Sequence, residues 1–190
     1  MTSTEVTTPR LDAFVADCRA AAAGPDARQQ VVALMKDLVA DPSELAGSVP
    51  PMASYDSTPS GDRLGGDVVL FEDETVTIVL VDTLPGVLQP PHDHLMTAII
   101  GMFEGCEKQR FFARTANGVT PTPGRDLGPG EVVVIGTDGI HAISTDDDLA
   151  RGVHVYLGSL STVKRSIFHP ETFEEEPLTM ERYHEYCRAS

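Results

Sequence analysis

Three histidines have the side-chain type and the spacing of a metal-binding site. His92 and His94 stand two residues apart at the end of the segment Gly86-Val-Leu-Gln-Pro-Pro-His92-Asp-His94. Side chains two residues apart on an extended segment point to the same face, so both imidazoles can reach one ion. His141 follows a predicted strand and turn that begin at Gly130, and a strand–turn–strand return would bring it beside the first pair. We therefore expect these three histidines to bind one metal ion.

The chemistry of such a site depends on what else binds the ion. Three neutral imidazoles on one side of a metal leave the opposite positions open for a substrate or for dioxygen. A closed zinc site normally has a fourth protein ligand, often a cysteine, and no cysteine lies near His92 and His94 in the sequence. The alternative is that these histidines are ordinary hydrogen-bonded residues, because an isolated His-x-His pair also occurs by chance.

A second pair with the same spacing, His154 and Tyr156, lies on a predicted strand beyond His141. Both side chains would face the same side of that strand, toward the interior. A tyrosine hydroxyl that is oriented by an imidazole can donate a hydrogen bond to a substrate group or to oxygen at a metal. The alternative is that both residues simply alternate into the core. The other two histidines, His169 and His184, are expected to be structural or exposed.

Helical patterns flank the part of the chain that carries these residues. Apolar residues recur at helical spacing from Pro9 to Ala23 and again from about Asp26 to Asp41, where Asp41-Pro42 should end the helix. We interpret residues 1–45 as a helical cap and residues 46–66, rich in Pro, Ser and Gly, as a loop. At the other end, residues 171–190 are expected to form a strap or a short helix, with Glu174–Glu176 as a solvated charge run.

Residues 67–170 consist of short β-type runs separated by turn clusters such as Pro121–Gly130. Seven or more short strands without intervening helices indicate an antiparallel sandwich or barrel. The protein is therefore expected to be mainly β, with N-terminal α-helices. The predicted strands are Asp67–Phe71, Thr75–Val81, Thr97–Phe103, Gln109–Arg114, Val132–Ile135, His141–Ser144 and Gly152–Leu157.

Composition limits the partners of the protein. The chain carries 14 Lys and Arg against 29 Asp and Glu, and this net charge of −15 disfavours nucleic acids and anionic membranes. No apolar run is long enough to span a bilayer, and the N-terminus lacks the pattern of a secretory signal. The three cysteines are too widely spaced for a disulfide framework. We expect a cytoplasmic monomer or homodimer with small-molecule partners and no nucleic-acid or membrane partner.

Over about residues 64–170 the sequence resembles the cupin superfamily, whose fold is a double-stranded β-helix, or jelly-roll barrel. The first cupin motif, G-x5-H-x-H, matches Gly86, His92 and His94, and the second, a Gly-rich strand and turn that end in His, matches Gly130 to His141. The acidic residue that usually follows the first motif is missing, since residues 95–100 contain no Asp or Glu. The site is thereby similar to the three-histidine iron site of the thiol dioxygenases, the group of cysteine dioxygenase and 3-mercaptopropionate dioxygenase. The resemblance implies Fe(II) as cofactor and the oxidation of a small thiol by O2 to a sulfinate.

The same resemblance implies roles for residues around the metal. His154 and Tyr156 match the last two members of a Ser-x-His-x-Tyr relay beside the iron, although Gly152 stands where the serine would be. Arg165 follows Tyr156 by nine residues, which is the spacing of the carboxylate-binding arginine in 3-mercaptopropionate-type enzymes. The alternative for Arg165 is a surface residue next to Lys164.

Two features of the animal-type cysteine dioxygenases are not matched. Their arginine lies on an early strand, and the corresponding position here is near Gly66, with Arg63 close by. Their Cys–Tyr crosslink requires a cysteine where this chain has Ala98, so no crosslink is expected and Cys106 is interpreted as an ordinary free thiol.

The chain departs from the thiol-dioxygenase pattern at Gly66, Thr97 and Gly152. These positions are on the substrate side of the predicted pocket, and the metal ligands are unchanged. A cupin oxygenase that acts on a non-thiol small molecule therefore remains an alternative. So do a metal-dependent isomerase or epimerase and a non-catalytic metal- or ligand-binding cupin. Oxygen consumption with thiols and with non-thiols separates the two oxygenases, and an isomerase needs no oxygen.

Overall fold

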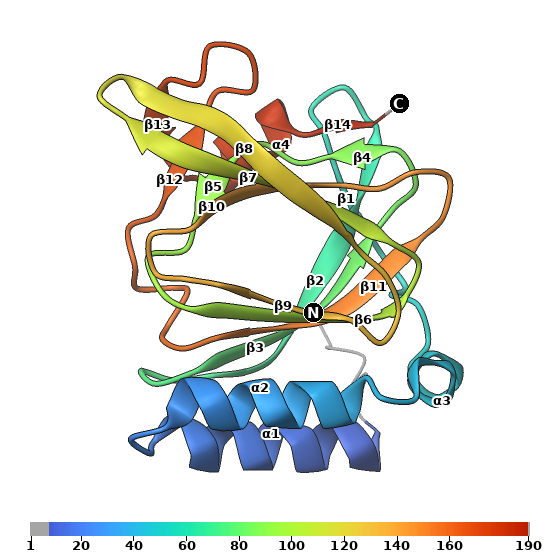
Figure 1. Ribbon diagram of the computed structural model, residues 1–190. Coiled ribbons are helices and arrows are strands. Elements are labelled where there is room, and N and C mark those ends of the chain that lie inside the picture. Colours follow the sequence, from blue (N-terminus) through green and yellow to red (C-terminus); the bar gives the residue numbers. More distant parts are fainter. Residues whose placement is uncertain (1–7, 190) are drawn as a thin grey trace.

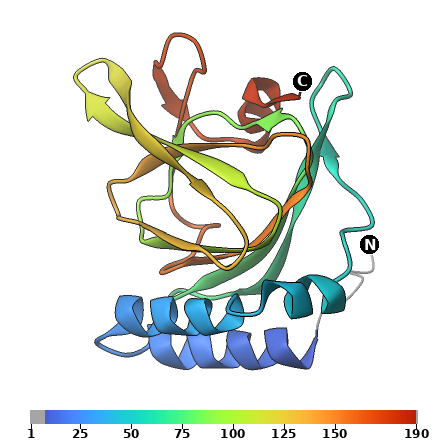
Figure 2. The ribbon, with the colours of Figure 1, turned by 45° about the vertical axis from the view of Figure 1, so that its right-hand side comes forward.

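A layer of helices lies against one of two antiparallel β-sheets in the computed structural model, which describes residues 8–189 (Figure 1). The first seven residues of the predicted cap lie outside the described residues. The expectation that the N-terminus carries no secretory signal concerns mainly these residues. The second sheet lies on the far side of the first, away from the helices. Figure 2 shows the C-terminal helix beyond the second sheet, at the opposite end of the molecule from the N-terminal layer.

Two of the helices begin at a side-chain N-cap that is followed by a proline. Thr8 accepts a hydrogen bond from the backbone N–H of Leu11 and Asp41 accepts one from that of Glu44, each followed by a proline in the first turn. The Asp41-Pro42 pair therefore follows the end of one helix and also begins another, which runs into the stretch expected to be loop. The helices are α1 (Pro9–Ala22), α2 (Ala27–Leu38), α3 (Pro42–Ser48) and α4 (Met180–Tyr186).

Both sheets are antiparallel throughout the described residues. The first has the strand order β1 (Asp56–Ser57), β2 (Arg63–Glu72), β3 (Thr77–Thr83), β11 (Ala150–Tyr156), β6 (Ala98–Glu104) and β9 (Val132–Ile135). The second has the order β13 (Glu175–Pro177), β12 (Ser166–Phe168), β5 (His92–Asp93), β10 (Ile140–Ser144), β4 (Val87–Leu88) and β14 (Arg188–Ala189). Strand β7 (Glu107–Thr115) also pairs with β10 and joins it to β8 (Gly118–Leu127).

The first sheet is covered on both faces, so the residues of its central strands are buried on both sides of the sheet, polar ones included. On β11, Val153 and Val155 pack against the core beneath α1 and α2, whereas Tyr156 packs into the core between the two sheets. All seven residues of β11 are buried, as are all seven of β3. Residues two apart on these strands therefore share one environment, either the helical side or the space between the sheets.

The predictions of fold class and of N-terminal helices are confirmed, and several boundaries are wrong. The stretch 46–66, expected to be loop, contains the end of α3, all of β1 and the start of β2. The turn cluster Pro121–Gly130 lies largely within β8, and the charge run at Glu174–Glu176 enters the short strand β13. Among the described strands β8 pairs with β7 alone, and prolines are tolerated on such an edge strand because the missing N–H groups face solvent.

The free cysteines and the short C-terminal helix agree with the expectations from the sequence. The three cysteines, Cys18, Cys106 and Cys187, are all free. None of the helices in the described part of the chain is long and apolar enough to cross a membrane. The segment 171–190 contains the short helix α4, which agrees with the helical spacing of Met180, Tyr183 and Cys187.

Candidate metal centre

The three predicted ligands meet because their strands are neighbours in the second sheet. His92 on β5 pairs directly with His141 on β10, and His94 lies two residues further on the same face as His92. The intervening Asp93 turns the other way, where it accepts a hydrogen bond from the Ser166 backbone and pairs with Arg114 at 2.9 Å. One potential ligand atom from each histidine lies within 4.8 Å of those of the other two. The predicted convergence of His92, His94 and His141 is thus present.

The local sequence explains why the first two histidines are held on an extended segment. Gly86 begins the segment with a φ of 75°, in the left-handed region that favours glycine. Pro90 and Pro91 then restrict the backbone to extended conformations up to His92. The stretch from Gly86 to His94 therefore acts as a preformed arm that presents both imidazoles to β10.

Hydrogen bonds to the Nδ1 atoms orient two of the three imidazoles. Nδ1 of His92 lies 3.0 Å from the Pro90 carbonyl oxygen, and Nδ1 of His141 lies 2.8 Å from Oε1 of Gln109. Each Nδ1–H donates to its oxygen, which leaves the Nε2 lone pair available as a metal ligand. The Nε2 atoms of His94 and His141 are 2.9 Å apart, so both point to the same spot.

Burial keeps these imidazoles neutral. Removal from water lowers the pKa of His92 to about 4, and it lowers the pKa values of His94 and His141 well below the ordinary value. A neutral imidazole with a free Nε2 is the form that binds a metal. Three such donors with no acidic member among the described residues fit a divalent transition-metal ion.

Behind His141 lies a buried polar chain that the sequence did not reveal. Gln109 presents its oxygen to His141 and donates from Nε2 to Glu107 at 2.9 Å. The Glu107 carboxyl is fully buried, and this desolvation raises its pKa to about 7. Glu107 and Gln109 are two residues apart on β7, the strand that pairs with β10, which carries His141. Their spacing alone could have suggested a shared face, but nothing in the sequence showed that this face points inward.

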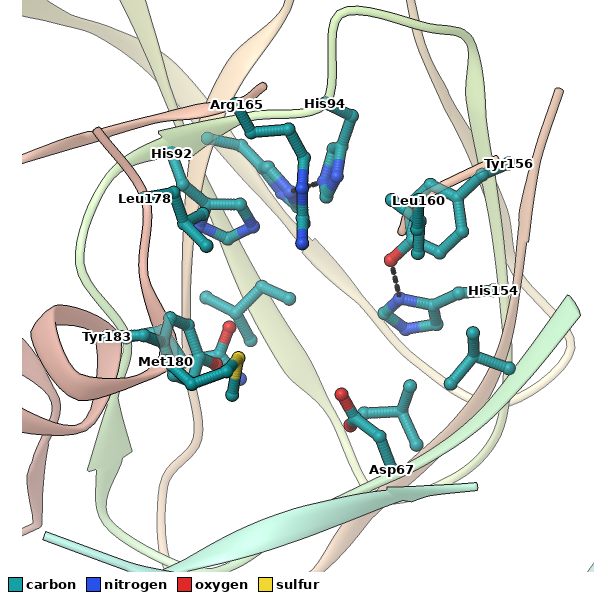
Figure 3. A pocket seen from close by; sticks show the side chains of 15 residues that line it. Asp67, His92, His94, His154, Tyr156, Leu160, Arg165, Leu178, Met180 and Tyr183 are labelled. Atoms are coloured by element: carbon teal, nitrogen blue, oxygen red, sulfur yellow. Dashed lines mark hydrogen bonds between the residues drawn. The ribbon is translucent and has the colours of Figure 1, made fainter. Parts of the chain in front are cut away.

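A cavity of about 110 Å³ opens beside the histidine cluster (Figure 3). It brings together all six residues predicted for the site. The structure adds lining residues from β2, from β3 and from the C-terminal segment. Its lining consists of Asp67, Val79, Val81, Gln89, His92, His94, His141, Ile143, His154, Tyr156, Leu160, Arg165, Leu178, Met180 and Tyr183.

His154 and Tyr156 face the cavity from the same side of β11, as their spacing predicted. Nδ1 of His154 lies 3.2 Å from the Tyr156 hydroxyl, and the Tyr156 ring is centred 4.7 Å from the ring of His94. Burial lowers the pKa of His154 to about 3 and raises that of Tyr156, so both are neutral near pH 7. Tyr156 can therefore donate its proton in a hydrogen bond next to the metal ligands.

The missing serine of the relay has a visible consequence. Nε2 of His154 is buried and has no hydrogen-bond partner within the described chain. A Cβ placed on Gly152 would lie 3.6 Å from this Nε2 atom but only 2.8 Å from Sδ of Met102. The Met102 sulfur therefore crowds the space that a serine side chain would enter, and His154 is held through Tyr156 alone.

Arg165 extends from the segment before β12 into the cavity, toward His92 and His94 (Figure 3). The side chain is half-buried, whereas the neighbouring Lys164 is exposed. Among the residues that the structure describes, the Arg165 guanidinium makes no hydrogen bond or ion pair. A free guanidinium in a cavity is a binding group for a carboxylate.

Asp67 and Tyr183 also line the cavity and were not predicted. Asp67 projects from β2 opposite Arg165 and remains accessible within the cavity, while the protein around it raises the pKa of its carboxyl to about 6 by desolvation. Tyr183 lines the cavity from α4, and its ring is centred 6.2 Å from that of His92. The sequence carried no signal for either contact, since both depend on long-range packing.

The chain can be compared with known proteins once this geometry is clear. No model of a known protein family matches the sequence. Among solved structures, the DMSP lyase DddQ from Ruegeria pomeroyi DSS-3 matches with a TM-score of 0.52 at 19% identity, over 87% of this chain and 99% of that one. This chain has the cupin fold.

Other cupin structures are more distant. The 11S globulin from Wrightia tinctoria matches with a TM-score of 0.47 at 11% identity, over 60% of this chain and 29% of that one. A single-residue variant of the oxalate decarboxylase of Bacillus subtilis matches with a TM-score of 0.43 at 16% identity, over 60% and 30%. Both scores are too low to support any statement beyond a distant likeness.

Proposed function

We propose that this cupin is a non-haem iron(II) dioxygenase that oxidises a small thiol to its sulfinate with O2. In this reaction both atoms of O2 are transferred to the sulfur, so that R–SH and O2 become R–SO2H. The observation that carries the proposal is a three-histidine group without an acidic member, opening into a cavity beside a hydrogen-bonded His–Tyr pair. The partners are therefore a small thiol and O2, and the three free cysteines favour a reducing, cytoplasmic setting.

The Nε2 atoms of His92, His94 and His141 would hold the metal, and the Nδ1 contacts of His92 and His141 keep their rings in place. When bound, iron(II) supplies open coordination positions at which thiolate and dioxygen come together, and it lowers the pKa of the thiol. The protein supplies orientation. Arg165 binds a carboxylate of the substrate, and Tyr156, held by His154, donates a hydrogen bond into the reacting region.

The cavity itself limits the size of the substrate. Its walls between the charged groups are formed by Val79, Val81, Leu160 and Leu178, which suit a short methylene chain. Tyr183 and Met180 of α4 close the side toward the C-terminus. A cavity of about 110 Å³ fits a thiol of a few carbon atoms and excludes a peptide or a nucleotide.

The test measures O2 consumption and products for protein loaded anaerobically with Fe(II). We expect consumption with small carboxylated thiols, one O2 per thiol, and a sulfinate that carries both atoms of labelled O2. His92→Ala, His94→Ala and His141→Ala should each lose bound iron and activity. His169→Asn is the matched control, because His169 lies outside the cavity and its Nδ1 accepts hydrogen bonds that an asparagine can retain.

Tyr156→Phe separates metal binding from turnover. The variant should keep its iron, because Tyr156 is not among the ligand candidates, and should lose about 10²-fold in kcat through the missing proton donor. Full activity in this variant would remove Tyr156 from the mechanism. O2 consumption with non-thiols but with no thiol would favour the other cupin oxygenases, and a transformation without O2 would favour a lyase or an isomerase.

A further inference from the structure

Two opposite charges face each other across the cavity without a partner. Asp67 on β2 and Arg165 before β12 both line it, and Figure 3 shows their side chains entering from opposite walls. They attract each other weakly, but they do not form an ion pair within 4.0 Å. Within the described chain, neither the Asp67 carboxylate nor the Arg165 guanidinium makes a side-chain hydrogen bond.

Deeply buried charges elsewhere in this protein are paired, whereas Asp67 keeps an exposed surface. Asp93 binds Arg114 at 2.9 Å and also accepts the Ser166 backbone N–H. Arg151 donates to Asp82 at 3.1 Å and to Glu104 at 2.9 Å. Partial removal of a charge from water is unfavourable unless another group replaces the lost hydration. Asp67 is exposed and lines the cavity, so its unpaired carboxylate is accessible to a group that the protein does not itself contain.

The surroundings of Asp67 favour a cation. The charged groups that act on it are the carboxylates of Asp56 and Asp82 and the side chains of Arg165 and His184. The Asp82 carboxylate is already paired with Arg151, and Oδ2 of Asp56 lies 3.6 Å from Nε2 of His184. Among the described residues, Arg165 is thus the one cation directed into the same cavity, and it stands on the opposite wall. The Asp67 end of the cavity is negative and the Arg165 end is positive.

We propose that Asp67 is a specificity-determining residue that binds a positively charged group of the substrate, while Arg165 binds its carboxylate. This inference rests on the proposed function and narrows its substrate class to thiols that are also zwitterions, with an ammonium group held by the protein. The thiol at the histidine cluster, the carboxylate at Arg165 and the cation at Asp67 then make three points of attachment. Three such points distinguish the two mirror-image forms of a chiral amino acid thiol.

The first experiment measures binding without turnover. Calorimetry with the metal-loaded protein compares thiol-free, straight-chain ω-amino carboxylates of one to four methylenes with carboxylates of the same length that lack nitrogen. We expect at least one zwitterion to bind at least tenfold more tightly than its carboxylate, and Asp67→Asn to abolish that preference. Glu74→Gln is the control, because it removes the same charge from an exposed turn. No preference in the wild type, no binding of any probe, or a preference that survives in Asp67→Asn overturns the inference.

The second experiment uses turnover and separates the two proposals. For Asp67→Asn we expect KM for cysteine to rise about tenfold, KM for 3-mercaptopropionate to stay the same or fall, and the preference for one enantiomer of cysteine to weaken. If thiols are oxidised but Asp67→Asn affects both substrates equally, the inference fails and the proposed function stands. If no thiol is oxidised but the zwitterion preference depends on Asp67, the thiol dioxygenase proposal fails and the binding role of Asp67 stands.

Discussion

Strand β11 carries two groups of buried polar residues, one on each face, and they differ in how completely they are paired. On the side of the helices, Arg151 donates from all three of its side-chain nitrogens, to Asp82, to Glu104 and to the carbonyl oxygens of Val49 and Pro50. On the other face, Nε2 of His154 has no partner in the described chain, and across the cavity Arg165 and Asp67 are unpaired. We call the first group the Arg151 cluster and the second the cavity group.

The difference shows that burial of a charged group does not by itself mark a functional site. Arg151 and Asp82 are each only 1% exposed and are more deeply buried than Arg165, yet every contact of the Arg151 cluster is made within the protein. Such a cluster fixes the segment around residues 49–52 against the first sheet, because Asp82 also accepts the backbone N–H of Met52. The cavity group has hydrogen-bonding capacity left over, and this capacity is what a substrate can use.

The largest expected effect is on stability and distinguishes the two arginines. Arg151→Met should lower the free energy of unfolding by about 3–5 kcal/mol, because it leaves the Asp82 carboxylate buried without its partner. Arg165→Met should change it by no more than about 0.5 kcal/mol, because no ion pair within the described residues is lost. Urea unfolding of the metal-free proteins at pH 7 measures both. Equal losses in the two variants would contradict the division between the clusters.

A smaller effect is expected on metal affinity when the support of one ligand is removed. Gln109→Leu deletes the oxygen that receives the Nδ1–H of His141, and this should weaken metal binding by about 10- to 100-fold. Gln89→Leu makes the same chemical change at a residue that lines the cavity but contacts no metal-ligand candidate, and should leave the affinity unchanged. Competition with a chromophoric chelator measures the affinities. Equal affinities in the two variants would show that the Gln109 contact does not support the site.

A third effect, small over any one pH unit, concerns the pH dependence of stability in the metal-free protein. His154 has a pKa of about 3 in the folded chain because burial disfavours its charged form, against an ordinary value of 6.5. Between these two values the unfolded chain binds a proton that the folded chain does not, so His154 causes stability to fall as the pH falls. His154→Gln should remove about 1 kcal/mol per pH unit of this dependence between pH 6 and pH 4.

The measurement is urea unfolding at several pH values. Asp67 and Glu107 have raised pKa values and act in the opposite direction, but they are present in both proteins and do not account for a difference in slope. Parallel curves for the wild type and His154→Gln would show that His154 is not kept neutral by the fold.

The metal ligands could be predicted from the sequence because their signals are local. The His-x-His spacing on an extended segment needs only the period of a strand, and the proline pair before His92 supports that conformation. The position of His141 could be predicted from a strand–turn–strand return, which the register between β5 and β10 bears out. Arg165 was found through the resemblance to thiol dioxygenases, since no local pattern distinguishes it from Lys164.

The remaining parts of the site depend on tertiary structure. Asp67 faces the cavity because β2 lies beside β3, and Gln109 supports His141 because β7 pairs with β10. Neither pairing is encoded in the spacing of nearby residues. Helix α3 was missed for another reason, since seven residues rich in Pro, Ser and Gly resemble a loop until the Asp41 cap is recognised.

The central claim is that the Nε2 atoms of His92, His94 and His141 hold one metal ion with no protein carboxylate. A crystal structure of the protein loaded anaerobically with Fe(II), with anomalous data collected at the iron absorption edge, tests it most directly. The account predicts a single iron peak about 2.1 Å from all three Nε2 atoms, with its open side toward the cavity. Iron bound elsewhere, or bound here with an aspartate or glutamate as a further ligand, would contradict it.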